Sequence, residues 1–119
     1  MAPTEEDRAT RERRSLISGA DTKAARRASR AVIGAYHEAS LADLIERVRD
    51  GLARYDAGEL DAFELDEVIH QYKRAARELW KFCVGAGGHV LSAARTLEYW
   101  EAEGELPDWW EAGAPHRAR

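Results

Sequence analysis

Glu67 and His70 have the spacing in this sequence that best suits metal chemistry. Residues three positions apart in a helix project from one side, and Glu-x-x-His pairs supply ligands in di-iron helical bundles. Glu38, beside His37, could add a carboxylate from the preceding helix. However, the apolar residues around Glu67 and His70 lie on the opposite side of the helix, whereas ligands of a core metal must point inward. We therefore predict no metal and no other cofactor, and keep a metal-binding bundle as the second alternative.

The other residues capable of catalysis form no recognisable pattern. His37, His89 and His116 are scattered, and Cys83 falls on an apolar stripe without a residue pattern that would stabilise a thiolate. The glycine-rich segment 85–88 comes before a predicted helix, as a phosphate loop would. A helix rather than a strand precedes it and no lysine follows, which favours a reverse turn. The sequence therefore predicts a protein that is not an enzyme.

The first thirty residues are basic and the remainder is acidic. Residues 1–30 hold eight arginines and lysines against five acids, a charge of +3, whereas residues 31–119 carry −7. A basic arm can bind an anionic partner, and a nucleic-acid-associated regulator is the first alternative function. Acids are interleaved in the arm and no helix-turn-helix spacing is evident, which weakens that alternative. The partner-binding candidates here are Arg26, Arg27 and Arg30.

Two adjacent tryptophans near the end of the chain form a second candidate for partner binding. Trp109 and Trp110 follow Pro107 and Asp108, which predicts a short turn or a single helical turn that lays two indoles on another part of the protein. The simplest interpretation is that they anchor the core and its edge. Exposed together, they would instead form a protein-binding surface.

Residues from about 40 to 84 predict an antiparallel helical hairpin. In each half, apolar residues recur at three and four, which places them in a stripe about 100° wide. Gly58 suits the left-handed position after a helix, and Asp61 with Glu64 predicts a capping box for the second helix. Acids crowd the start of that helix and bases its end, as the helix dipole favours. These bases are Lys73, Arg74, Arg77 and Lys81. We expect the core to contain Leu44, Val48, Leu52, Val68, Tyr72 and Leu79.

A preceding helix is predicted over residues 23–36, with Asp21 as its N-cap. Its anchors Val32, Ile33 and Tyr36 lie about 120° around the wheel from the stripe that follows. We therefore expect a bend or a restart between His37 and Ser40, rather than one continuous helix whose two parts pack against different neighbours.

The fold class expected is all-α: the hairpin at about 40–84 plus a third helix at about 89–103, in a small helical bundle. Gly104 should end the third helix. Residues 1–20 should be a mobile charged arm, residues 21–112 a single helical domain, and residues 113–119 a loose tail. The arm is too polar for a signal peptide, and no apolar run reaches the roughly 20 residues needed to span a bilayer.

The single cysteine and the absence of a membrane span favour a cytoplasmic location. The excess of arginine over lysine, 15 to 3, with no asparagine, suggests a GC-rich bacterial genome. Two apolar stripes need more cover than two helices give each other, so we predict a homo-oligomer, most simply a homodimer. The function expected is that of a small non-enzymatic interaction protein: an adaptor, a regulator or an assembly subunit.

Overall fold

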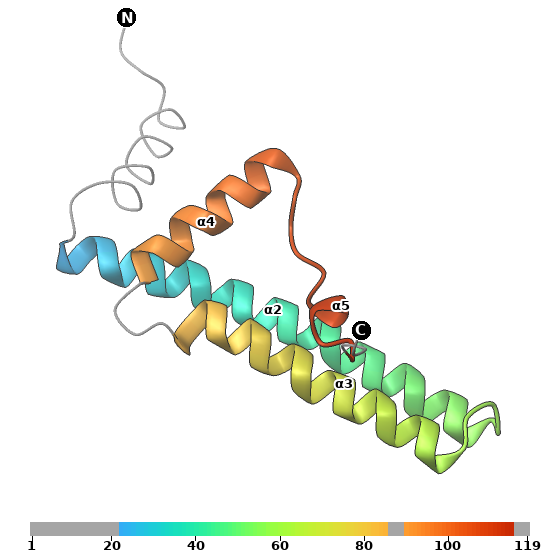
Figure 1. The fold of residues 1–119 in the computed structure, drawn as a ribbon. Coiled ribbons are helices and arrows are strands. Elements are labelled where there is room, and N and C mark those ends of the chain that lie inside the picture. The colour runs from blue at the N-terminus through green and yellow to red at the C-terminus, as the bar shows by residue number, and fades with distance from the viewer. Residues whose placement is uncertain (1–21, 86–89, 116–119) are drawn as a thin grey trace, which may run out of the picture. The chain divides into compact units, whose positions relative to one another are not determined.

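The computed structural model describes residues 22–85 and 90–115. Its elements are α2 (Lys23–Asp56), α3 (Ala62–Trp80), the π-helical turn η1 (Lys81–Gly85), α4 (Val90–Glu103) and α5 (Trp109–Ala112). The described residues contain no strand, so the all-α class is confirmed, with the hairpin and the third helix where they were predicted (Figure 1). The N-terminal arm, His89 and residues 116–119 lie outside the described residues.

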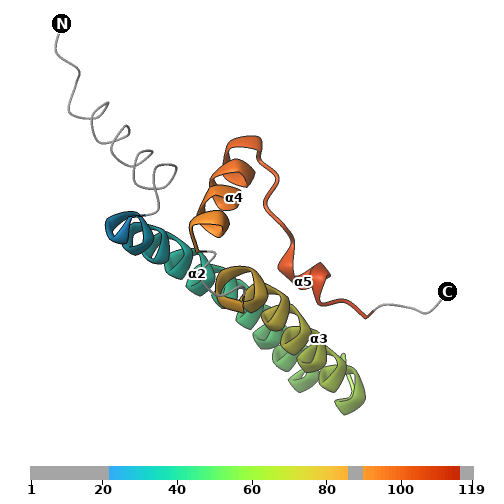
Figure 2. The same cartoon turned by 60° about the vertical axis from the view of Figure 1, so that its left-hand side comes forward.

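The chain divides into two compact units that share α2. One joins α2 up to Ala35 with α4 and the residues as far as Leu106, and the other joins Tyr36–Gly85 with the residues from Pro107 onward. In the second unit, α3 returns alongside the later part of α2, and α5 lies beside α3 (Figure 1 and Figure 2).

α2 is one uninterrupted helix of 34 residues, so the restart predicted between His37 and Ser40 is wrong. Its buried residues share an arc of about 100° over the whole length, counted at 100° per residue. They are Ala25, Ser29, Ile33, Leu44 and Gly51. Small residues form much of this side, so a wheel restricted to large apolar residues missed it and suggested two helices of different orientation.

Capping follows the predictions at the hairpin and differs at the start of α2. Asp61 accepts a hydrogen bond from the Glu64 backbone N–H at 2.8 Å, and the Asp61 N–H donates to the Glu64 carboxylate at 3.0 Å, which completes the predicted capping box. Gly58 has φ +77°, the left-handed conformation that glycine adopts without strain. At α2, the Ala25 N–H donates to Thr22 Oγ1, so Thr22 makes the cap that we assigned to Asp21, which lies outside the described residues.

The core of the second unit is small. Leu44 and Leu79 are buried, as predicted, together with Ala75 and Cys83. Val48, Val68 and Tyr72 are only half-buried. Leu52 is 44% exposed, so its assignment to the core is wrong. The reason is geometric: α2 and α3 each cover one side of the other, and Leu52 lies outside that side.

The first unit packs through small residues. Its buried residues on α2 are Ala25, Ser29 and Ile33, and those on α4 are Ala93, Ala94 and Leu97. Residues with short side chains allow helices to approach closely. No helix in the described ranges is long and apolar enough to cross a membrane.

Leu44→Ala and Leu79→Ala should each lower the free energy of unfolding by about 2–5 kcal/mol, because each leaves a cavity in this small core. Leu106→Ala makes the same chemical change at a side chain that is 54% exposed, and should have little effect. Thermal unfolding followed by circular dichroism compares the three. Equal melting temperatures for Leu79→Ala and Leu106→Ala would contradict the assigned core.

Candidate functional site

The short helix α5 is attached to the hairpin through a cluster of three aromatic rings. The Trp109 indole N–H donates a hydrogen bond to the Tyr36 hydroxyl at 2.6 Å. The ring of Phe82, on η1, lies edge-on to Tyr36 at 6.1 Å and 5.8 Å from Trp109, measured between centroids. Such ring pairs are favourable geometries for aromatic side chains. The cluster therefore connects α2, η1 and α5.

Trp110 provides the second attachment. The Arg47 guanidinium on α2 lies 5.5 Å from the centroid of its ring, within the range of a cation–π interaction. On α3, the side-chain amide of Gln71 donates to the Trp110 carbonyl at 3.0 Å. The two indoles considered for partner binding are thus half-buried and engaged within the chain.

Gly113 makes the closest approach of this segment to α3. A Cβ atom on Gly113 would lie 2.7 Å from Cα of Ala75 and closer still to its backbone nitrogen, so only glycine fits here. The Arg74 Nε–H donates to the Gly113 carbonyl at 2.7 Å. Gly113 is therefore buried, although we expected the loose tail to begin at this residue.

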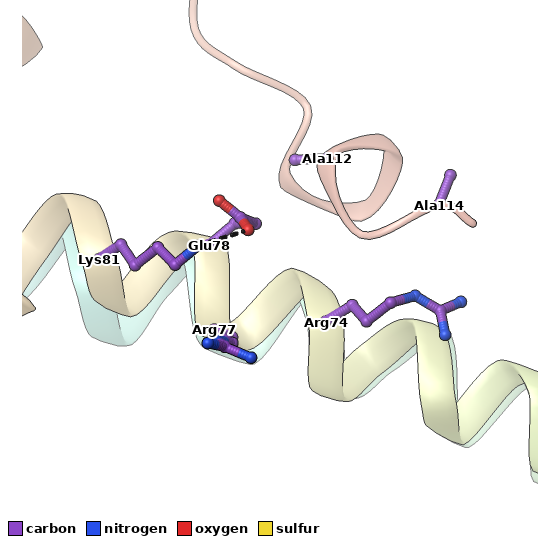
Figure 3. Close-up of a pocket in the computed structure, with 6 residues that line it drawn as sticks. All are labelled: Arg74, Arg77, Glu78, Lys81, Ala112 and Ala114. Carbon is purple, nitrogen blue, oxygen red and sulfur yellow. Dashed lines mark hydrogen bonds and ion pairs between the residues drawn. The ribbon is translucent and has the colours of Figure 1, made fainter. Parts of the chain in front are cut away.

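Between α3 and α5 lies a pocket of about 290 Å³, called here the basic pocket (Figure 3). It is lined by Arg74, Arg77, Glu78, Lys81, Ala112 and Ala114. Lys81 Nζ and Glu78 Oε1 form an ion pair at 3.0 Å. Arg74 extends from α3 along the segment that follows α5 (Figure 3), and its Nη2 atom is buried without a hydrogen-bond partner in the described part of the chain.

The face of the hairpin opposite α5 carries a group of partly exposed apolar residues. On α2, Tyr36 and Arg47 contact α5, and Ile45 and Leu52 lie about 140–180° around the helix from them. On α3, the residues that meet α5 include Gln71 and Ala75, and the apolar residues about 120–180° away include Ile69 and Trp80. We call this surface the open face. It consists of Leu41, Ile45 and Leu52 on α2, and Ile69, Ala76 and Trp80 on α3.

Three of the large apolar side chains on the open face are exposed. Ile45 is 39% exposed, Leu52 44% and Trp80 50%. Leu41, Ile69 and Ala76 are half-buried. Grouped apolar surfaces of this kind mark contact sites more often than isolated exposed residues do.

The candidate metal ligands are dispersed. Glu67, His70 and Glu38 are all exposed. His70 Nε2 lies 3.2 Å from Asp66 Oδ2, one helical turn away, an ordinary surface pair. Among the described residues, no group of three or more histidine, cysteine or acidic side chains is placed to hold a metal ion.

The remaining candidates are placed as follows. Arg27 and Arg30 are exposed on α2, and Arg26 is half-buried there. The basic arm that precedes them lies outside the described residues, so the nucleic-acid hypothesis stays a prediction. Cys83 is a buried free thiol, and burial raises its pKa to about 11.

Sequence reasoning missed the basic pocket, although it singled out its cations. Arg74, Arg77 and Lys81 were interpreted only as bases that complement the dipole of their helix. The missing information was the position of α5, which no local pattern gives.

Compared with protein-family models, curated proteins and solved structures, the chain has no match in any of the three.

Gly113→Ala should displace α5, because the new methyl group would collide with backbone atoms of α3. We expect a loss of about 1–3 kcal/mol in stability and a red shift of tryptophan fluorescence as Trp109 and Trp110 become exposed. Gly34→Ala is the matched control: it lies inside α2 with no atom within 4 Å of the added carbon, and should gain about 0.5–1 kcal/mol. A red shift absent from Gly113→Ala would show that α5 does not depend on this contact.

Cys83 should react slowly with thiol reagents in the folded protein. A pKa of about 11 instead of 9.0 lowers the thiolate fraction at pH 8 by about 100-fold, and steric burial slows the reaction further. The rate of reaction with an aromatic disulfide reagent, compared with the rate in urea, measures this. Because the folded pKa is raised, the stability that the neutral thiol contributes is complete below pH 9 and is lost as the pH rises toward 11. Native and unfolded rates that agree within a few-fold would contradict the burial.

Proposed function

We propose that this protein is a small non-enzymatic interaction protein that acts through the open face, and that the partner on this face is a second copy of the chain. The observation that carries the proposal is the exposure of Ile45, Leu52 and Trp80 on one face of a hairpin whose other face is covered by α5. An adaptor, a regulator or an assembly subunit would use such a face for contact rather than for chemistry.

A second copy suits this face because it carries the same exposed apolar residues. In a two-fold symmetric contact each molecule offers the same patch, so one association covers both exposed stripes at once. Two hairpins stacked in this way give a four-helix bundle, the common solution for helices that each have one uncovered apolar side. The open-face residues of α2 extend from Leu41 to Leu52, or about 17 Å along the helix axis.

The core of the second unit also favours such an association. Leu44 and Leu79 are its only large side chains among those described with less than 5% exposure. A core of that size contributes little stability alone. An added apolar layer would enlarge it without any change in the hairpin. We also propose a cytoplasmic location, because the chain has a single cysteine and so uses no intramolecular disulfide.

Light scattering after size exclusion tests the proposal. The wild-type protein should have a mass of twice 13.4 kDa at micromolar concentration. Raising the salt concentration should change this little, because an apolar contact is not screened. The double variant Ile45→Lys, Leu52→Lys should have the monomer mass, because a dimer would bury two unpaired charges from each copy in the apolar contact.

Tyr99→Lys is the control for that experiment. Tyr99 is 60% exposed on α4 and lies in the other unit, so the same kind of substitution there should leave the dimer intact. A wild-type mass near 13.4 kDa at every concentration would rule out self-association. A dimer that survives the double lysine variant, or that salt dissociates, would place the contact elsewhere.

A further inference from the structure

The basic pocket has the composition of an anion site. Two guanidinium groups and one ammonium group line it, against a single carboxylate. The ion pair between Lys81 and Glu78 balances the carboxylate with the ammonium group. The charge that remains is that of Arg74 and Arg77, so the pocket is left with about two positive charges.

Neither guanidinium is saturated by the protein. Arg74 donates one hydrogen bond, from Nε to the Gly113 carbonyl, and its Nη2 atom has no partner within the described ranges. The Arg77 guanidinium forms no hydrogen bond or ion pair with any described residue, and Arg77 is exposed. A guanidinium group carries five donors in a planar fork that matches the oxygens of carboxylate and phosphate groups.

The remaining walls leave room for a ligand. Ala112 and Ala114 contribute only methyl groups from the α5 side (Figure 3). The volume of about 290 Å³ is near the lower limit for pockets that hold small organic molecules. The position of α5 is fixed by Gly113 and by the aromatic cluster, so this wall does not depend on the ligand for its place.

From these observations we infer that the basic pocket binds a small anion through a carboxylate or phosphate group held by Arg74 and Arg77. This site is separate from the proposed self-association, because Arg74, Glu78 and Lys81 lie about 100–160° around α3 from Trp80 of the open face, and Arg77 lies between the two, about 60° from Trp80. In a dimer formed through the open face, both basic pockets stay accessible.

Calorimetric titration at constant ionic strength tests the inference, with inorganic phosphate and succinate as separate probes and chloride as the background anion. We expect saturable binding of at least one probe, and the probe that binds identifies the oxyanion. Arg77→Gln should weaken that binding about tenfold or more, because it removes one of two charged forks. Because no hydrogen bond or ion pair joins the Arg77 side chain to another described residue, its replacement should leave the circular dichroism spectrum and the melting temperature unchanged.

Lys73→Gln is the matched control. This substitution removes the same charge as Arg77→Gln, from an exposed residue one turn earlier on α3. Lys73 does not line the pocket. If the bases serve only to complement the helix dipole, the two variants will behave alike. Equal loss of binding in both variants, or no saturable binding of either probe at millimolar concentration, overturns the inference. The double lysine variant on the open face should keep the site, so failure of one proposal is distinguishable from failure of the other.

Discussion

A helix can cover only part of the circumference of a single neighbour, and this constraint governs the second unit of the protein. α3 buries Leu79 and Ala75, and α2 contributes Leu44. The close approach of the two helices is visible at Gly51, where an added Cβ would lie 3.1 Å from Val68. Each helix nevertheless keeps two further sides, one on each face of the hairpin. What occupies those two faces decides what the protein can do.

One face is occupied by a segment that cannot be stable alone. α5 has four residues, fewer than the number at which an isolated helix becomes stable in water. It is held by contacts that differ in kind: a hydrogen bond between Trp109 and Tyr36, a cation–π contact from Arg47, and the fit of Gly113 against Ala75. Arg74 belongs to this set through its bond to Gly113, so one residue both positions the segment and lines the pocket beside it.

The two faces therefore have opposite chemistry. The α5 side combines cations with a pocket, whereas the open face is made of Ile45, Leu52, Trp80 and their neighbours. Apolar surface favours contact with another apolar surface, and guanidinium groups favour oxyanions. A molecule that associates through the open face and binds an anion through the basic pocket would use different faces of the same two-helix layer for the two events.

The sequence by itself determined the elements, because their causes are local. The capping box at Asp61, the left-handed glycine at Gly58 and the three-and-four spacing of apolar residues act within a few positions of each other, and all three are found where predicted. The continuity of α2 was not predictable in this way, since its buried side includes Ser29 and Gly51, which an apolar pattern does not register. Only the tertiary structure decided that Leu52 is exposed and that Arg74 and Arg77 share a pocket with α5. The first fact depends on which side of α2 is covered by α3, and the second on where α5 packs, almost 40 residues beyond Arg74. Burial is fixed by such distant neighbours rather than by the periodicity of the helix itself.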